Sequence, residues 1–320
     1  MSHRGDTARL VGKQFAGALI ALIASSFVVF AALYAAPGNT LKFLAGGRTL
    51  SPEAEAAISA EYRLDEPFLA RYWHWLTDVV HGDFGNSLVS KVSVSSLLGP
   101  RVGTTLLLVA MAGLITILGG IALGLLSGLS GKRTQSVTNA AANVAMAIPA
   151  FVVASILITI FAVGLGWFPV FGSGSGFLDQ VYHLFLPSIA LALGGVAYIG
   201  RVAAVSIERA AASEYVDTAR SRGLPWRMIV RRHVLRNAMI PIATVAGITF
   251  AGLIATSVVV ESAFGVEGLG SLMVESVLTK DFAVVQAIAL ILVAGFLAVN
   301  LAVDLLYTRL DPRLRGSARS

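Results

Sequence analysis

Charged residues with regular spacing are concentrated in one basic stretch, residues 213–241, between two long apolar segments. A short helix is predicted at its start, with Glu214 and Asp217 in the first turns and Arg220 and Arg222 at the end. The helix macrodipole favours this distribution of charge. Two interpretations follow from the residues alone. The stretch is either a surface that engages a partner or an amphipathic surface helix that only satisfies membrane topology.

The ends of this helix carry recognisable signals. Ser213 is a predicted N-cap, and Gly223 is predicted to end the helix in a left-handed conformation. Pro225 is expected to begin a second helix that leads back towards the membrane. Four arginines form i, i+4 pairs on this second helix and give it a basic stripe: Arg227, Arg231, Arg232 and Arg236.

No catalytic constellation is evident in the sequence. Cysteine is absent, and the five histidines are scattered. His74 and His81 are seven residues apart and could share a helix face, but ordinary surface histidines are favoured there over a metal site. No phosphate-binding loop of the G-x-x-x-x-G-K-[ST] type occurs, and the glycine-rich residues 265–270 are interpreted as a turn or a re-entrant segment. Any uphill transport must therefore draw its energy from a partner or an ion gradient.

The composition is that of a helical membrane protein. Hydrophobic residues make up 56% and charged residues 13% of the 320 residues, and the mean hydropathy is +0.78. Soluble domains carry roughly twice that share of charge. Six apolar runs are each long enough to cross a membrane: residues 15–36, 104–129, 137–165, 184–205, 238–260 and 282–307. An even number of spans places both termini on the same side.

The distribution of charge predicts the orientation. With six spans, 17 of the 24 basic residues but only 6 of the 18 acidic residues fall on the side of the termini. Basic residues are enriched in cytoplasmic loops, so both termini and the basic stretch are predicted to be cytoplasmic. This asymmetry also accounts for the net charge of +6 without a nucleic acid partner.

Small and polar residues within the spans suggest how the helices pack. Gly120, Gly124 and Gly128 recur at four-residue spacing and predict a smooth face for close helix packing. Pro149 is expected to kink the third span. Asp304, near the inner end of the sixth span, would matter most in an ion-coupled secondary carrier, although a structural pairing with a nearby arginine is the favoured interpretation.

Several motifs resemble one family, the permease subunits of binding-protein-dependent ABC importers. The basic stretch resembles the "EAA" loop of that family through Glu214, Tyr215, Ala219, Gly223, His233, Asn237, Ala238 and Pro241. Further similarity lies at residues 82–88, 148–151, 166–170, 260–270 and 300–313, and it is closest to the B-type permease of the dipeptide/oligopeptide/nickel branch. One departure is Glu267, where the family usually has proline.

The resemblance implies an all-α integral membrane fold of the type I ABC importer permease, with six transmembrane helices, a short cytoplasmic coupling helix and an extracytoplasmic segment after the first span. The expected organisation is a cytoplasmic tail (1–13), a first helix (14–36), an extracytoplasmic segment (37–100), a permease domain (101–310) with a coupling loop (207–237), and a second tail (311–320). The expected location is the cytoplasmic membrane of a prokaryote.

The resemblance also implies the partners. These are a second homologous permease, two ATP-binding subunits that hold ATP and Mg, an extracytoplasmic substrate-binding protein, and membrane lipid. This chain would hold no cofactor and catalyse no reaction. Peptides are the expected cargo. The alternatives are nickel, haem or another small solute in the same machine, an ion-coupled carrier, and a structural membrane scaffold.

Roles for individual residues follow from the resemblance in the same way. Glu214, Tyr215, Ala219 and Gly223 are expected at the contact with an ATP-binding subunit. Arg220 and Arg222 are expected to pair with acidic residues of that subunit. Three further residues are expected to carry motion from the coupling loop into the fifth span: His233, Asn237 and Pro241.

Overall fold

The computed structural model describes residues 3–34, 51–53, 56, 59, 65–87 and 89–310, which are helical apart from turns and connecting loops. Five helical runs are long and apolar enough to cross a membrane: α1 (His3–Tyr34), α5 (Val94–Gly128), α8 (Phe177–Ala211), α10 (Trp226–Ile229) continuing through the π-helical η2 (Val230–Val234) into α11 (Leu235–Phe264), and α13 (Phe282–Leu310). With one broken helix pair counted as a sixth span, the predicted all-α membrane fold is confirmed. The predicted tail 311–320 and most of residues 37–64 lie outside the described residues.

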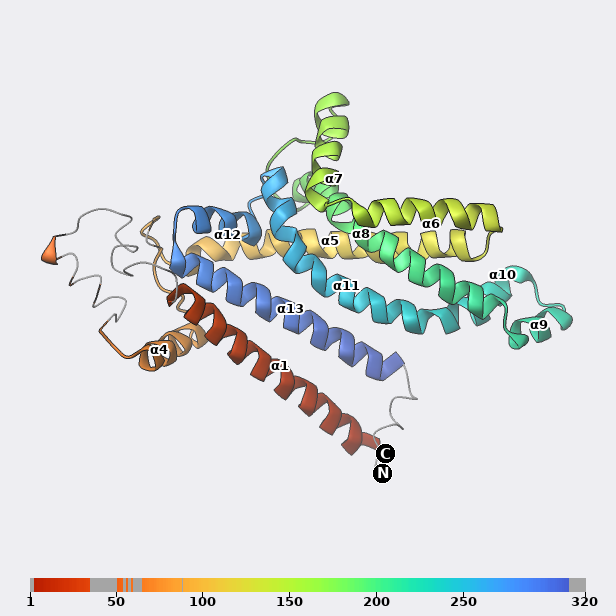
Figure 1. Cartoon of the computed structure of the whole chain (residues 1–320), viewed down its shortest axis with the longest axis horizontal. Helices are drawn as coiled ribbons and strands as arrows, with labels where there is room; N and C mark the ends of the chain where they lie inside the picture. Colours follow the sequence, from red (N-terminus) through yellow and green to blue (C-terminus); the bar gives the residue numbers. More distant parts are fainter. Residues whose placement is uncertain are drawn as a thin grey trace.

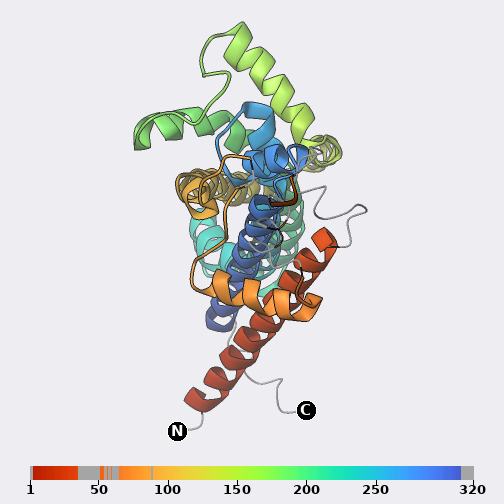
Figure 2. The same cartoon turned by 90° about the vertical axis from the view of Figure 1, so that its left-hand side faces the viewer.

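The third span is broken more severely than the predicted kink. It consists of α6 (Lys132–Ala147), then α7 (Ala150–Leu157) and the π-helical η1 (Ile158–Gly164), and the two halves are bent by 100°. Pro149 lies in the break and disfavours a helical conformation at Ile148, which is extended with φ −81° and ψ 122°. The carbonyl of Pro149 then accepts the amides of Val152 and Val153 and begins α7. Both views show α7 projecting sideways from the bundle (Figures 1 and 2).

The packing of α5 against α8 depends on small residues. Gly120, Gly124 and Gly128 lie on the face of α5 that meets α8. A Cβ atom at Gly124 would overlap with Ala203, and one at Gly128 would overlap with the carbonyl of Ala204. The two backbones therefore approach each other more closely than larger side chains would allow.

The elements between the spans lie at two opposite ends of the bundle (Figure 1). One end carries α9 (Glu214–Ser221) and α10, and the other carries α4 (Phe68–Val80) and α12 (Leu269–Leu278). We call them the α9 end and the α12 end. The first turn of α1 and the last turn of α13 both point towards the α9 end, as an even number of crossings requires.

Candidate functional site

The candidate site is centred on α9, which begins without the side-chain cap predicted from the sequence. Ser213 occupies the N-cap position, but its hydroxyl donates to the carbonyl of Ala210 in α8. The carbonyl of Ser213 instead accepts the amide of Val216 at 2.9 Å. Ser213 thus fixes the corner between α8 and α9, because its hydroxyl bonds to α8 and its carbonyl accepts a hydrogen bond from α9.

The end of α9 is a Schellman motif. Gly223 has φ +74°, the left-handed conformation predicted for it. Its amide donates to the carbonyl of Arg220 at 2.9 Å, and the amide of Leu224 donates to the carbonyl of Ala219 at 3.2 Å. No atom lies within 4 Å of the position that a Cβ of Gly223 would take. A side chain there would strain the backbone without causing a clash.

The inner face of α9 is anchored in an apolar cluster. Val216 is fully buried and Ala219 is 5% exposed, and both belong to a cluster that includes Ile207 of α8, Ile229 of α10 and Val234 of η2. The contact of Ala219 with an ATP-binding subunit stays a prediction, and the structure adds that its side chain is buried. Its methyl group faces the bundle, so it supports α9 from beneath and does not present its side chain to a partner.

The outer face of α9 is polar and exposed. Its exposed charged and aromatic side chains, together with the following Arg222, form what we call the α9 surface: Glu214, Tyr215, Asp217, Arg220 and Arg222. The guanidinium carbon of Arg220 lies 4.6 Å from the centre of the Trp226 ring, a cation–π geometry that joins the end of α9 to the start of α10. The surface therefore offers acidic groups at its start and basic groups at its end.

The helix that follows carries the predicted basic stripe. Arg231, Arg232, His233, Arg236 and Asn237 line an open cavity of about 810 Å³. Among the residues that the structure describes, no acidic side chain forms an ion pair with these arginines. The cavity therefore has an uncompensated positive charge and favours an anionic partner.

The three residues expected to join the coupling loop to the fifth span lie on one continuous helix. The His233 ring lies 6.5 Å from the ring of Tyr215 on α9, and the Asn237 side-chain amide donates to the carbonyl of His233 at 2.9 Å. Pro241 lies inside α11 without ending it. The run from Trp226 to Phe264 is thus one structural element that starts beside α9 and ends at the α12 end.

Sequence reasoning missed a buried carboxylate at the far end of that element. Glu261 is fully buried near the end of α11. The hydroxyl of Thr105 donates to its Oε1 at 2.9 Å, and the amides of Gly270 and Ser271 donate to its Oε2 at 2.6 and 3.2 Å. Glu261 thereby joins α11, α5 and the start of α12. The available signal was an acid just before a glycine-rich helix start, because a helix N-terminus attracts negative charge.

The backbone of Glu267 makes a hydrogen bond that the family's usual proline could not make at this position. Its backbone amide donates to the hydroxyl of Ser173 at 2.7 Å and joins the turn before α12 to the loop before α8. Proline has no amide hydrogen and could not make this bond.

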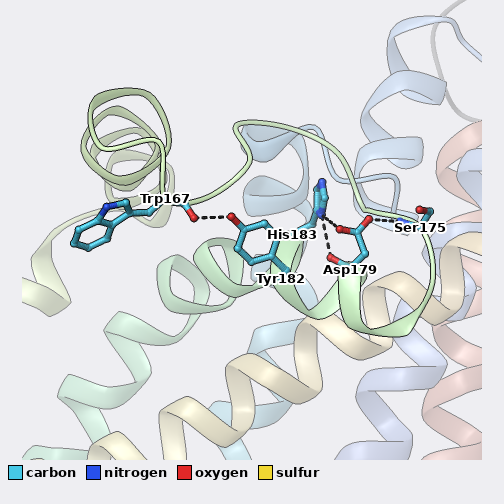
Figure 3. A network of polar contacts seen from close by, with 5 residues as sticks. All are labelled: Trp167, Ser175, Asp179, Tyr182 and His183. Carbon is cyan, nitrogen blue, oxygen red and sulfur yellow. Dashed lines mark hydrogen bonds and ion pairs between the residues drawn. The ribbon is translucent and has the colours of Figure 1, made fainter.

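The loop between η1 and α8 has its own polar network (Figure 3). Asp179 accepts the amide of Ser175 at 2.7 Å, and its other carboxylate oxygen lies 3.3 Å from Nδ1 of His183. The Tyr182 hydroxyl donates to the carbonyl of Trp167 at 2.6 Å. These bonds hold both ends of the loop on the first turns of α8.

His74 and His81, the two candidate residues for a metal site, each have a different partner. His74 pairs with Glu66 at 2.9 Å, whereas Nδ1 of His81 lies 2.8 Å from the carbonyl of Thr77. Within the described ranges, no group of three or more potential metal ligands comes together. Asp304 lies in α13, but its side chain is outside the part of the chain that can be described.

The structure is thus a membrane bundle with up to six spans and a short helix, α9, that is anchored on one face and exposed on the other at one end. Comparison with known proteins identifies the family. The model of the "binding-protein-dependent transport system inner membrane component" matches residues 120–316, and the model of its N-terminal part matches residues 7–108. The chain belongs to this family of ABC importer permeases, in the peptide/nickel branch, and is a non-catalytic membrane subunit.

Two relatives and two solved structures illustrate the relationship. The chain is 34% identical over 308 residues to the glutathione transport system permease protein GsiC of Salmonella choleraesuis (strain SC-B67) and 34% identical over 310 residues to that of Escherichia coli (strain K12). Each match covers 95% of this chain and 97% of the relative. The inward-facing MetNI methionine ABC transporter matches with a TM-score of 0.53 at 19% identity, covering 67% of this chain and 96% of that chain. An amino acid ABC transporter matches with a TM-score of 0.52 at 23% identity, covering 67% and 94%. These two matches concern the fold.

Proposed function

We propose that this permease moves peptides across the cytoplasmic membrane of a prokaryote, as half of a pathway formed with a second homologous permease. A substrate-binding protein delivers the cargo outside, and two ATP-binding subunits drive the cycle from the cytoplasm. The chain is 34% identical in sequence to permeases of glutathione, which is a tripeptide, and this similarity supports a peptide cargo. The excess of basic residues at the α9 end supports its cytoplasmic location.

The observation that carries the proposal is the construction of α9. An element that receives force from another protein must be exposed on one face and fixed on the other. The α9 surface is exposed, while Val216 and Ala219 hold the helix to α8, α10 and η2. The Schellman motif at Gly223 and the stacking of Arg220 on Trp226 fix its far end. An ATP-binding subunit that moves the α9 surface therefore moves this whole corner of the bundle.

The helix from α10 to α11 is the proposed route of that motion into the membrane. Its 39 residues correspond to a length of about 58 Å at 1.5 Å per residue. Its His233 ring lies 6.5 Å from the Tyr215 ring of α9, and near its other end the buried carboxylate of Glu261 joins it to α5 and α12. A displacement at the α9 end would thus reach the α12 end through one continuous element. ATP and Mg would bind to the partner subunits.

Reconstitution tests this function directly. The chain is placed in proteoliposomes with the permease, ATP-binding and binding-protein subunits encoded beside its gene, and uptake of labelled peptides is measured. We expect uptake that requires ATP and every subunit. Uptake by this chain alone, without ATP, would contradict the proposal. Parallel assays with nickel ions and haem test the cargo separately from the mechanism.

A further inference from the structure

Helix α4 has a wider apolar face than the described residues cover. Its thirteen residues run from Phe68 to Val80 beside the far end of α1 (Figure 2). On a helical projection the apolar residues occupy one continuous arc of roughly 160°. Half of that arc meets α1, and the other half is exposed at Leu69, Trp73 and Val80 and partly buried at Leu76.

The covered half fixes how α4 is rotated about its own axis. Tyr72 is 4% exposed, and its hydroxyl lies 2.8 Å from the hydroxyl of Ser26 on α1. The rings of Phe27 and Tyr72 are 5.2 Å apart, and those of Phe30 and Trp75 are 5.4 Å apart. Phe68 also packs on Phe27 and Phe30, so three of the four Phe, Tyr and Trp residues of α4 are turned towards α1. Only Trp73 among them is left exposed.

The uncovered half forms a stripe at helical spacing, which we call the α4 stripe. It consists of Leu69, Trp73, Leu76 and Val80, at positions i, i+4, i+7 and i+11. Leu69 is 61% exposed, Trp73 60% and Val80 75%. The neighbouring sector of the helix is polar and exposed and contains His74, Thr77 and Asp78. An exposed apolar stripe beside a polar sector is the pattern of a helix at a membrane surface.

The position of α4 identifies what covers the stripe. Helix α1 is long and apolar enough to span a membrane, and from Phe15 to Val28 its exposed large side chains are apolar, including Ile20 at 68% and Val28 at 63% exposure. Phe27, itself 38% exposed, packs on both Phe68 and Tyr72 of α4. The exposed apolar surface of α1 therefore continues directly onto α4.

We propose that α4 binds the membrane surface at the α12 end of the bundle. The α4 stripe enters the boundary between headgroups and acyl chains, and His74 and Asp78 face the water. Trp73 suits this depth because its ring is apolar and its indole N–H can bond to headgroups or water. Helix α1 would then be fixed in the membrane both by its own span and by α4, which lies in the interface. This arrangement resists changes in the tilt of α1.

The absence of cysteine makes the proposal simple to test. Single variants Leu69→Cys, Val80→Cys and His74→Cys of the full chain are spin-labelled in nanodiscs of phosphatidylethanolamine and phosphatidylglycerol. Collision rates are measured with oxygen, which concentrates in lipid, and with a water-soluble nickel chelate. His74 is the matched control because it lies one residue and about 100° from Trp73.

We expect the nickel chelate to reach Leu69 and Val80 about fivefold less often than His74, while oxygen reaches them at least as often, because the stripe lies in the lipid interface. Equal access of the chelate to all three positions would overturn the proposal, since α4 would then lie in water or be unfolded. Low access of both reagents at Leu69 and Val80 would also overturn it, since protein would then cover the stripe.

Discussion

The two ends of the bundle are held together in different ways. Helix α9 makes its hydrogen bonds with residues close in sequence, as in the Schellman motif at Gly223, and its anchors to the bundle are apolar. At the α12 end, polar side chains join distant segments. Thr105 bonds to Glu261 across 156 positions, and Ser87 bonds to the buried Asp281 across 194.

This difference suggests different mechanical roles. Helix α9 with its two turns is a compact local unit, and its own hydrogen bonds join no remote parts of the chain. The α12 end is cross-linked, so the ends of α5, α11 and α12 must move together. We infer that the α9 end receives motion and that the α12 end converts it into movement of several helices at once.

The largest expected effect comes from removing a cross-link. Glu261→Ala would leave the Thr105 hydroxyl and the amides of Gly270 and Ser271 without their buried acceptor. We expect a loss of stability on the order of 3 kcal/mol, because each buried unsatisfied group costs about 1–3 kcal/mol. Thermal unfolding in detergent measures the loss. Glu275→Ala, on the exposed side of α12, is the control, and an equal melting temperature for both variants would contradict the cross-link.

The next largest effect on stability is expected from the close packing of α5 against α8. Gly124→Leu would force α5 and α8 apart, because even a Cβ at this position overlaps with Ala203. We expect a loss of about 1–3 kcal/mol, as for overpacked cores. Gly103→Leu on the same helix is the matched control, since nothing lies within 4 Å of its Cβ position. A melting temperature of Gly124→Leu that is equal to or above that of Gly103→Leu would contradict the close packing.

The smallest effect on stability is expected at the α9 end. Arg220→Ala removes the stacking on Trp226, which at an exposed site contributes about 0.5–1 kcal/mol. The melting temperature should barely change, while ATP-driven transport should fall several-fold because the end of α9 is less firmly held. Arg220→Lys keeps the charge and tests whether a planar group is needed. Unchanged transport by Arg220→Ala would show that the stacking is dispensable.

The difference between local and long-range contacts also explains which features the sequence could predict. The spans, the glycine face of α5 and the left-handed Gly223 follow from local composition and spacing, and the structure contains all three. The bond of Thr105 to Glu261 and that of Glu267 to Ser173 join segments 156 and 94 positions apart, and no local pattern reveals these two partners. Pro149 indicated a disruption, but the 100° bend depends on how the two halves pack. The burial of Ala219 depends likewise on contacts with other helices.

The central claim is that α9 receives the force that drives transport, and Gly223→Val tests it most directly. Valine strongly resists the φ of +74° that ends α9, but no neighbouring atom obstructs it. Gly131→Val is the matched control, since Gly131 precedes α6 with an extended φ of −69° and open space around it. Membrane insertion and ATP-driven uptake are measured for both in the reconstituted complex. We expect both variants to insert normally and only Gly223→Val to lose transport. Transport by Gly223→Val at the wild-type rate would contradict the claim.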